Sequence, residues 1–540
     1  MQTVTVQLKV SGAPFETNSK AETISARPTE QRMTMRRIAC GSRGPFRWFM
    51  VRVVERSATR MAIEARRAYG RGEFLGVIGT GVLCMAYPAV AAGAPDRPGG
   101  RLVFPGDADY AAACREQNAR LDLAPDVIAY CQTPDDVVQA IRWATARDKP
   151  VAVRSGGHDY EGFSLNQHGL VIDVSDYDDI TLHDDGRRAT IGAGATLGDT
   201  YRELAKANRT LPGGTCPSVG IAGLATGGGY GMLVRRSGLT CDWLRRVTLV
   251  DRDGRARDSS ADKHGDDILW AVRGAGGGSF GVITDFEFET IACPAQVVYF
   301  SVRWKWDSST IATVLARWME WTNDDRRDRT SGLTLQNGAG RTVHLTGQFL
   351  GDEREVLQMV SALSKGTTPT QTVVTSMSYT DAVKAFAGSA SPRQSWKNKS
   401  SFGSDPLNSK TITDAVDLLE AAPHSVTCVL SFDTFGGAAN DVAPDRTAFP
   451  HRGMSYLLQC QTYWGLPDAA GPAFDWVRNA FAILDPHTAQ RSYRNYADLD
   501  LKDWQRRYFA DNYPRLQTIK RSLDPHDVFR HPQSIELPAS

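Results

Sequence analysis

Two nucleophilic side chains, His158 and Cys216, each stand inside a glycine-rich turn, and this feature constrains the chain more than any other. His158 lies in Arg154-Ser-Gly-Gly-His-Asp-Tyr-Glu-Gly162, and Cys216 lies in Pro212-Gly-Gly-Thr-Cys-Pro-Ser-Val-Gly220, which continues to Gly227-Gly-Gly-Tyr-Gly231. Glycines let a backbone approach a ligand closely, and consecutive N–H groups in such turns cradle phosphate. The two turns therefore predict a nucleotide cofactor that the backbone binds and that both side chains tether.

Three further segments follow these turns along the chain. They are Asp267-Ile-Leu-Trp-Ala-Val-Arg-Gly-Ala-Gly-Gly-Gly-Ser-Phe-Gly281, Tyr493-Arg-Asn-Tyr-Ala-Asp498 and Asp524-Pro-His-Asp-Val-Phe-Arg-His-Pro-Gln-Ser-Ile535. Each motif alone is a weak signal, because short motifs have a high false-positive rate. Taken together and in this order, they make the chain resemble the berberine-bridge-enzyme-like branch of the vanillyl-alcohol-oxidase flavoproteins, which carry FAD attached through both a His and a Cys.

The resemblance implies FAD as the cofactor, attached covalently at two places. His158 would bond through an imidazole nitrogen to the flavin 8α-methyl carbon, and Cys216 would bond as a thiolate to ring carbon C6. Both bonds need a deprotonated nucleophile. The other residues that the resemblance implies at the cofactor are Arg154, Ser155, Gly156 and Gly157 at the pyrophosphate, Gly220, Gly223, Gly227, Gly228 and Gly229 along the ribityl chain, Gly281, Val282 and Ile283 at the adenosine end, and Asn495 and Val219 near the ring.

The sequence lacks the marks of several other classes of protein. No Gly-x-Gly-x-x-Gly motif stands in the context that a nicotinamide cofactor requires, and no His, Cys and carboxylate cluster has zinc-ligand spacing. The formal net charge of +1 gives no electrostatic footprint for nucleic acid. Nine cysteines over this length do not make a disulfide scaffold. Cys114 and Cys131 flank one short segment and either pair or stay free thiols.

Residues 1–94 do not look like part of the fold. Residues 1–60 are polar and Arg-rich, without a sustained hydrophobic period. A basic stretch after Met61, a short apolar run at Leu75–Ala86 and small residues after it are typical of a secretory signal peptide. The pair Arg66-Arg67 suggests twin-arginine export, although the match is imperfect. We therefore expect export, with cytoplasmic retention as the alternative and Met61 as a candidate start codon.

A chain of 540 residues is too long for one ordinary core, so two domains are expected. Strands and helices alternate over residues 95–295, which predicts the FAD-binding domain. The texture changes over 296–486, where the pattern is typical of an antiparallel sheet with helices on one face. The resemblance implies an α+β fold, in which a PCMH-type FAD-binding domain is joined by a substrate domain whose antiparallel sheet roofs the flavin. It also implies that residues 487–540 return to the cofactor domain.

Individual elements are predicted from local patterns. Thr133-Pro-Asp-Asp136 and Thr196-Leu-Gly-Asp199 are capping signals that start helices. The other predicted helices are Thr411–Ala422 and Gly471–Leu484. The predicted strands are Val151–Val153, Leu170–Val174, Ala189–Ala193, Val297–Trp304, a hairpin from Leu333 to Leu350 around Asn337-Gly338, Val426–Phe432 and Met454–Trp464.

Oxidation of an alcohol by a flavin needs a base for the hydroxyl proton. Tyr493-Arg-Asn-Tyr496 resembles the segment that places a tyrosine beside the flavin in this family, and Tyr496 is our first choice for the base and Tyr493 our second. A phenol with a pKa near 10 is a poor base at neutral pH. A neighbouring positive charge or a hydrogen bond must therefore shift its pKa.

A second catalytic candidate is Gln459, in the predicted strand that ends at Trp464. Leu457, Gln459, Gln461 and Tyr463 share one face of that strand, and the matching family strand points a glutamine at the flavin. The position two before it is often Lys in plant members and is Leu457 here, which puts a lysine-assisted base in doubt. Tyr160 follows the flavin-linked His158 closely and is expected to reach the substrate pocket.

The leading interpretation is an FAD-dependent oxidase that acts on an alcohol of a sugar, a glycoside or another small metabolite. Oxygen would reoxidise the flavin and release hydrogen peroxide. Val219 favours this acceptor, because the resemblance implies an oxygen gate at its place, where a small Val goes with oxidases and Leu with dehydrogenases. The alternatives are a flavin-dependent dehydrogenase, an oxidative ring-forming enzyme of natural-product biosynthesis and a flavin-bearing binding protein. We expect no metal, no nucleic-acid partner and no stable membrane association.

Overall fold

The structure is a computed structural model. It describes residues 21–23, 34–36, 95–337, 341–388 and 393–539. The chain divides into two compact units, Met1–Gly93 and Ala94–Ser540. In the first unit the described residues form the strands β1 (Ala21–Thr23) and β2 (Thr34–Arg36), which pair antiparallel. The predicted signal peptide, which ends near residues 91–94, lies outside the described residues.

A small sheet carries the first glycine-rich turn. Its strands, in spatial order, are β3 (Arg101–Val103), β4 (Val127–Tyr130), β6 (Leu170–Asp173) and β5 (Val151–Arg154), of which the last three are parallel. Helix α3 (Pro134–Thr145) connects β4 to β5 and starts with the predicted capping box between Thr133 and Asp136. Because β5 ends at Arg154, the strand leads directly into the turn that holds His158.

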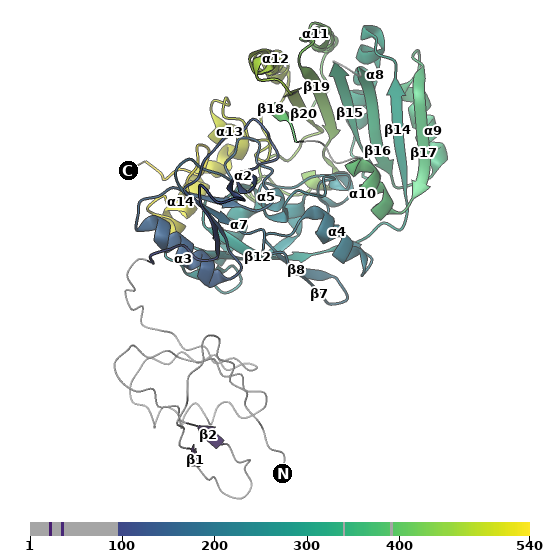
Figure 1. Cartoon of the computed structure of the whole chain (residues 1–540). Coiled ribbons are helices and arrows are strands. Elements are labelled where there is room, and N and C mark those ends of the chain that lie inside the picture. Colours follow the sequence, from purple (N-terminus) through teal and green to yellow (C-terminus); the bar gives the residue numbers. More distant parts are fainter. Residues whose placement is uncertain (1–20, 24–33, 37–94, 338–340, 389–392, 540) are drawn as a thin grey trace, which may run out of the picture. The chain divides into compact units, whose positions relative to one another are not determined.

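A second, five-stranded antiparallel sheet lies beside the first (Figure 1). In spatial order its strands are β11 (Ala256–Asp258), β10 (Leu244–Val250), β12 (Val282–Glu289), β8 (Arg188–Gly192) and β7 (Ile180–His183). The helices and short strands of this region are α2 (Tyr110–Ala113), α4 (Leu197–Ala205), α5 (Ile221–Thr226), α6 (Val234–Ser237), α7 (Gly265–Ala275), β9 (Arg209–Thr210) and β13 (Ile291–Ala292). Both sheets contribute to one continuous apolar core.

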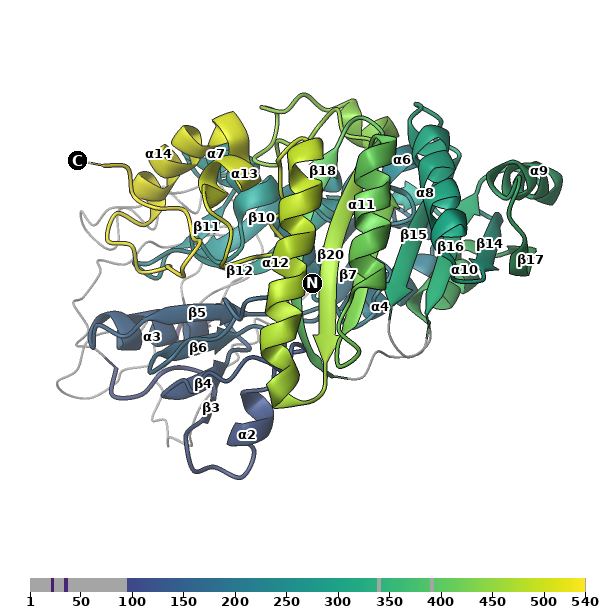
Figure 2. The ribbon, with the colours of Figure 1, turned by 90° about the horizontal axis from the view of Figure 1, so that it is seen from above.

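A seven-stranded antiparallel sheet forms the other half of the second unit (Figures 1 and 2). In spatial order its strands are β17 (Pro369–Met377), β14 (Val297–Trp304), β16 (Thr342–Phe349), β15 (Arg329–Asn337), β19 (Thr427–Thr434), β20 (Tyr456–Trp464) and β18 (Ser395–Gly403). Its helices are α8 (Ser308–Thr322), α9 (Glu353–Leu363), α10 (Tyr379–Ala387), α11 (Ser409–Glu420) and α12 (Ala470–Leu484). The predicted strands and helices of this half are confirmed, although the turn residue Gly338 lies outside the described residues.

The two faces of this sheet differ in chemistry because side chains alternate along each strand. Leu333, Leu430 and Leu458 belong to a core that the helices α8, α11 and α12 cover on one face, as Figure 2 shows. The residues between them along the same strands are polar and point to the other face. Thr334, Ser431 and Gln459 represent this second face, since the strand register places them on neighbouring strands. The α+β architecture is therefore the one expected. Helices α8, α9, α11 and α12 contribute to the core on one face, whereas α10 packs on the other face of β14, where Phe386 meets Tyr299.

Strand β18 is not predicted from the sequence, and its composition explains why. The segment Ser-Trp-Lys-Asn-Lys-Ser-Ser-Phe-Gly has no apolar alternation, which is the usual mark of a strand. Nevertheless its residues from Trp396 onward are buried. Polar groups of other segments cover this edge strand, so burial here follows from tertiary contacts that the local sequence does not encode.

The C-terminal segment packs against the first core. Helices α13 (Trp504–Phe509) and α14 (Tyr513–Leu523) follow residue 487, and Leu516, Ile519 and Phe529 are buried in that core. A smaller aromatic cluster, which includes Phe402, Phe449 and Tyr493, lies against Tyr230 and Tyr496. The chain thus returns to the region of the glycine-rich turns, although the exact domain boundaries stay predictions.

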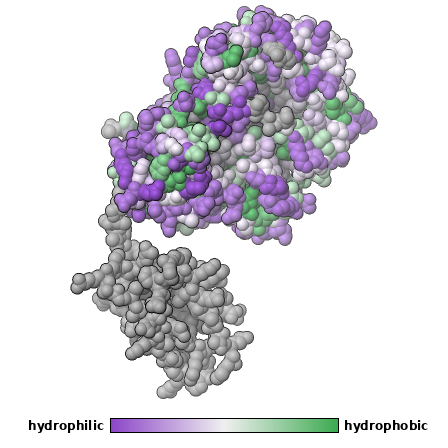
Figure 3. Space-filling view, viewed as in Figure 1, coloured by the Kyte–Doolittle hydropathy of each residue, from purple (hydrophilic) through white to green (hydrophobic). Residues whose placement is uncertain are grey.

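Several features of the described residues bear on function. Over those residues no helix is long and apolar enough to cross a membrane, and no group of His, Cys, Asp and Glu could hold a metal ion. Cys114 and Cys131 are both free thiols. The face of the described region that Figure 3 presents is mostly hydrophilic, with apolar residues scattered over it.

Candidate functional site

The two predicted tethering residues lie next to each other. The His158 Nε2 atom is 3.0 Å from Ser218 Oγ, and the Cys216 Sγ atom is 3.5 Å from the same oxygen. Burial lowers the pKa of the His158 imidazole, so the ring is neutral and nucleophilic at neutral pH. Cys216 and Ser218 are exposed. Two nucleophiles thus face the same open space from turns that are 58 residues apart in the sequence.

The two glycine-rich turns cross back to back at Gly156 and Gly220. A Cβ atom at Gly156 would lie 2.4 Å from the Gly220 nitrogen, and one at Gly220 would lie 2.6 Å from the Gly156 nitrogen. Any side chain at either position would push the turns apart. These two glycines are therefore required by the contact that brings His158 beside Cys216, whatever either backbone gives to a cofactor.

The residues predicted at the pyrophosphate are fixed by other contacts. The Arg154 guanidinium is buried, donates to Asp173 and the Ala113 carbonyl, and forms an ion pair with the buried Glu116 carboxylate, at 3.9 Å between Nη1 and Oε1. Ser155 Oγ donates to the Ala193 carbonyl at 2.7 Å. The Arg154 side chain is thus committed to the protein, and only backbone groups of Arg154, Ser155, Gly156 and Gly157 remain for a phosphate.

The second turn leaves room beside the two nucleophiles. Gly223, on α5, is exposed, and a Cβ atom built there would have no protein atom within 4 Å. Gly227 by contrast is in contact with Asn495, whose side-chain nitrogen donates to the Leu224 carbonyl at 3.0 Å. Open space over Gly223 beside exposed Cys216 fits a planar ligand bound along this turn. The residues present therefore fit FAD on this side of the site.

The positions predicted at the adenosine end lie at the start of β12. A Cβ atom at Gly281 would lie 2.7 Å from the Val250 carbonyl oxygen. Val282 is buried in the first core, and Ile283 packs against that core. Val219 also packs against it from the edge of the Cys216 turn. For these four residues the structure shows packing roles, and their contact with a cofactor stays a prediction.

Tyr493 is held by the second turn. Its phenolic oxygen accepts hydrogen bonds from the Gly229 N–H at 2.9 Å and from Asn495 Nδ2 at 3.0 Å. Gly228, which lies between Gly227 and Gly229, packs against Phe449 beside this ring. The Tyr493 side chain is almost completely buried. These contacts describe a tyrosine that fixes the turn, which leaves Tyr496 as the better placed of the two candidate bases.

Tyr496 begins a chain of hydrogen bonds that ends on a carboxylate. Its hydroxyl lies 2.6 Å from the Tyr230 hydroxyl, and Tyr230 donates to Asp433 Oδ2 at 2.9 Å. A phenol has only one proton to donate. Because Tyr230 gives its proton to Asp433, Tyr496 must donate to Tyr230, which leaves the lone pairs of the Tyr496 oxygen free to accept a proton.

Burial raises the pKa of every member of this chain. It raises the pKa values of Tyr496 and Tyr230 well above that of an ordinary phenol. It also raises the pKa of Asp433 from 3.8 to about 6, against the opposing effect of hydrogen bonds from Tyr230 and Gln459. Within the described part of the chain no cation pairs with Asp433. Of the two causes expected to shift the pKa of Tyr496, a hydrogen bond is present, to Tyr230. The group able to keep a proton near neutrality is Asp433.

The predicted glutamine lies beside this carboxylate. Gln459 is buried on the polar face of the sheet, and it accepts a hydrogen bond from Gln461 Nε2 at 2.6 Å. Tyr463 in turn donates to Gln461 Oε1 at 3.1 Å. Leu457, at the position where plant members often have Lys, is buried among aromatic side chains. The strand thus presents two linked glutamines and no lysine.

Tyr160 joins the site as expected. Its ring stacks on Tyr496 with a centroid distance of 5.2 Å and an interplanar angle of 17°, and it meets the edge of Trp396 at 5.6 Å. The Tyr160 ring thus connects the loop of His158 to the C-terminal segment of Tyr496. Trp396 comes from β18, so three distant parts of the chain meet at one aromatic stack.

Sequence reasoning did not identify Tyr230, Asp433, Ser218 or Trp396. Tyr230 stands inside the motif Gly227-Gly-Gly-Tyr-Gly231, which is defined by its glycines. Asp433 is an acidic residue directly after the apolar strand segment Val426–Phe432, which is a usable signal for a functional carboxylate at a strand end. Ser218 and Trp396 carry no comparable signal.

Comparisons with known proteins support a shared family. The family described as FAD binding domain matches residues 125–260, and the family described as Berberine and berberine like matches residues 492–536. The chain is 35% identical to the uncharacterized FAD-linked oxidoreductase YgaK of Bacillus subtilis (strain 168) over 81% of this chain and 96% of that protein.

Solved structures are similar over the same region. One is BBE-like 1 of Physcomitrella patens, with a TM-score of 0.76 and 26% identity over 82% of this chain and 98% of the other. Another is a chitooligosaccharide oxidase, with a TM-score of 0.74 and 26% identity over the same shares.

Proposed function

The chain belongs to the berberine-bridge-enzyme-like family of FAD-linked oxidoreductases, and on this premise we propose that it oxidises an alcohol group of a sugar, a glycoside or a similar hydroxylated metabolite. The observation that carries the proposal is the hydrogen-bonded chain from Tyr496 through Tyr230 to Asp433. It ends on a carboxylate whose pKa is raised to about 6. Removing a hydroxyl proton needs such an acceptor.

The cofactor we propose is FAD attached to both His158 and Cys216. The two side chains lie close to the same Ser218 oxygen, and the neutral imidazole that burial favours is able to form such a bond. When bound, the flavin supplies the two-electron acceptor for the alcohol and the centre at which oxygen is later reduced to hydrogen peroxide. Acid-precipitated protein should stay yellow, and only the double variant His158→Ala with Cys216→Ala should release all flavin.

The proposed proton path uses the direction of the hydrogen bonds. The Tyr496 oxygen accepts the proton of the substrate hydroxyl while its own proton moves to Tyr230 and the proton of Tyr230 moves to Asp433. No phenolate has to persist, because each oxygen passes one proton on as it receives another. This path avoids the cost that burial places on a charged Tyr496.

The substrate class is argued from the polar face of the seven-stranded sheet. The register places Ser431 opposite Gln459 and Asn398 opposite Gln461, all on the face that carries Asp433. Amides and hydroxyls at this density suit a substrate with many hydroxyl groups, and the face of an aromatic ring such as that of Trp396, on the same side of the sheet, suits the apolar face of a sugar ring. The similarity to a chitooligosaccharide oxidase supports this class.

Oxygen is the proposed acceptor, with a separate electron carrier as the alternative. Val219 lies at the edge of the Cys216 turn and packs against the core. Because protein interiors have few voids, one more methylene there would close a gap of the size that oxygen needs. Reduced wild-type protein should therefore reoxidise rapidly in air-saturated buffer, and Val219→Leu should slow this step. Slow reoxidation of the wild type would favour a dehydrogenase.

The decisive test of the function is a screen of sugars and hydroxylated metabolites under anaerobic conditions. Bleaching of the flavin absorbance by at least one of them is expected, followed by release of peroxide when air is admitted. Asp433→Asn should retain the flavin and lose most of the bleaching rate. A wild-type protein whose flavin no alcohol bleaches would refute the proposal.

A further inference from the structure

Edge strand β18 carries two lysines on the helix-covered face of the sheet, where apolar side chains are expected. The register pairs Lys397 with Thr462 and Lys399 with Cys460, so both lysines point to the helix-covered side, where the neighbouring strands place apolar residues. Their side chains are 1% and 6% exposed. Two buried ammonium groups are costly unless each is paired, so their partners must explain them.

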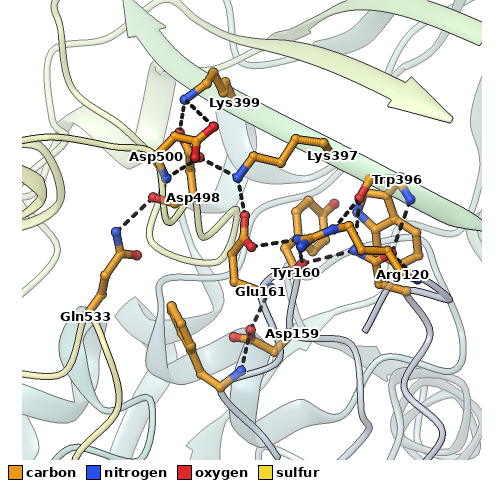
Figure 4. A network of polar contacts seen from close by, with 12 residues as sticks. Arg120, Asp159, Tyr160, Glu161, Trp396, Lys397, Lys399, Asp498, Asp500 and Gln533 are labelled. Carbon is orange, nitrogen blue, oxygen red and sulfur yellow. Dashed lines mark hydrogen bonds and ion pairs between the residues drawn. The ribbon is translucent and has the colours of Figure 1, made fainter. Parts of the chain in front are cut away.

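The lysines belong to an ion-pair network with three cations and three carboxylates, which Figure 4 shows. Lys397 binds Glu161 and, at 2.7 Å, Asp498 Oδ1. Arg120 binds the other Glu161 oxygen at 2.6 Å, and Lys399 binds the other Asp498 oxygen at 2.6 Å. Lys397 is thus the one group in this network that contacts both Glu161 and Asp498.

The partners of Lys397 are close neighbours of the stacked tyrosines. Glu161 is the residue after Tyr160, and Asp498 is two residues after Tyr496. The Tyr160 ring meets Trp396 on the polar face of β18, while Glu161 reaches Lys397 on the opposite face. Two loops therefore meet the edge of β18 from either side, with their rings on one face and their carboxylates on the other.

We propose that Lys397 is a positioning residue that holds the Tyr160 and Tyr496 rings together by binding Glu161 and Asp498 behind them. The inference rests on the proposed function, because it assigns the held rings a part in proton transfer from the substrate. Asn118 and Arg120 also fix the Tyr160 loop to β18, since both donate to the Tyr160 carbonyl and to the Trp396 carbonyl.

A simpler explanation of buried lysines is that they protect an edge strand from pairing with another chain. Lys399 distinguishes this explanation from the proposed link between the two loops. Lys399 lies on the same face of the same strand and binds Asp498, with Asp500 at 3.9 Å, but it makes no contact with Glu161. If the lysines only protect the edge, both should matter equally. If the link between the two loops matters, Lys397 should matter far more for catalysis.

Removal of Lys397 has a specific electrostatic consequence. In Lys397→Met, Glu161 keeps Arg120 and Asp498 keeps Lys399, while the network as a whole gains one negative charge. Arg478, which pairs with Asp500, and Tyr508 and Arg494 are the other charged or titratable groups that face it. The two carboxylates then repel each other unless one takes up a proton, so the rings should separate at high pH and close again at low pH.

The kinetic test compares Lys397→Met with Lys399→Met in the FAD-loaded protein. Lys397→Met should slow anaerobic flavin reduction by about 10²-fold at pH 8 with KM unchanged, since misplacement by about 1 Å can cost that much. Lys399→Met should lose similar thermal stability and much less rate. The deficit of Lys397→Met relative to wild type should shrink as the pH falls, and Lys397→Arg should recover most of the rate.

A second test needs no turnover, which separates this inference from the proposed function. A crystal structure of Lys397→Met at pH 8 should show Tyr160 and Tyr496 apart, and infrared titration should detect a protonated carboxyl that Lys397→Met with Glu161→Gln lacks. If Lys397→Met does not fold, Glu161→Gln alone should loosen the Tyr160 loop and lower the rate about tenfold. Unchanged ring stacking in either variant, or equal rate losses for Lys397→Met and Lys399→Met, overturns the inference.

Discussion

Two buried acidic regions flank the same aromatic stack, and they treat their carboxylates in opposite ways. Behind the stack, Glu161 and Asp498 are each bound by two cations. In front of it, Asp433 is contacted by the Tyr230 hydroxyl and by Gln459, and no cation pairs with it within the part of the chain that the structure describes. The cations fix the positions of Glu161 and Asp498. Asp433, without a cation, is able to gain a proton.

The contrast shows how burial alone can have either result. A buried carboxylate with cations stays ionised and serves as an anchor, at a high cost if one partner is lost. A buried carboxylate without cations has a raised pKa, which for Asp433 is about 6, and such a group suits acid–base chemistry near neutral pH. The position of the cations therefore distinguishes the reactive side of the site from its support.

The largest effect is expected when the reactive side loses its carboxylate. Asp433→Asn keeps an oxygen that can accept from Tyr230 but cannot hold the substrate proton, so flavin reduction should slow by about 10²–10⁴-fold. The same change should raise the melting temperature at pH 7, because the folded protein penalises the ionised form of a group with a raised pKa. Anaerobic stopped-flow and calorimetry measure the two effects, and a loss of stability would contradict the contrast.

The supporting side should respond in the opposite direction. Asp498→Asn leaves Lys397 and Lys399 without a shared charged partner, and breaking a buried ion pair costs about 3–5 kcal/mol. Its unfolding free energy in denaturant should fall by that order. Arg478→Ala, which removes only an exposed partner of Asp500, is the matched control and should cost less than about 1 kcal/mol.

The two tyrosines of the C-terminal motif sharpen the comparison further. Tyr496→Phe interrupts the chain to Asp433 and should slow flavin reduction by about 10²-fold. Tyr493→Phe removes the acceptor for Gly229 and Asn495, so its main effect should be on stability. Retained flavin colour in both variants is the control, and an exchange of the two outcomes would exchange the roles of the two residues.

The smallest effect is a pH dependence of the rate of flavin reduction, which we expect from Asp433 and not from Asp498. Asp433 must be ionised to accept a proton, so the rate of flavin reduction should be full above its pKa of about 6 and should fall about tenfold per pH unit below it. Asp433→Asn should lose this step. Asp498→Asn should retain this pH dependence of the rate, with a lower stability at every pH. Loss of the pH dependence in Asp498→Asn would contradict the assignment.

Local pattern predicted much of the fold. The helix after Thr133 starts with its capping box, and the strands at Val151, Leu170 and Val297 appear where apolar runs are bounded by turn residues. Strand β18 could not be found in this way. Its polar side chains are buried by Glu161 and Asp498, which lie more than 90 residues away in the sequence, and hydrophobic periodicity contains no information about such partners.

The candidate site divides in the same manner. His158, Cys216, Tyr496 and Gln459 stand in motifs that a reader can recognise, and the structure brings the first two to one oxygen and the last two to the neighbourhood of Asp433. Asp433 has only its place at a strand end as a signal, and Tyr230 has none apart from its glycine neighbours. Their importance comes from one hydrogen bond between residues 203 positions apart.

By itself, the sequence determined which reactive groups stand in glycine-rich turns, and therefore the family and the cofactor chemistry to expect. Glycine and a nucleophile carry that information locally, because backbone geometry and intrinsic reactivity belong to the residue and its neighbours. Only the tertiary structure decided which carboxylate is left without a cation and which lysine binds two loops together. Charge pairing and desolvation depend on distances between remote segments, and a linear sequence does not contain those distances.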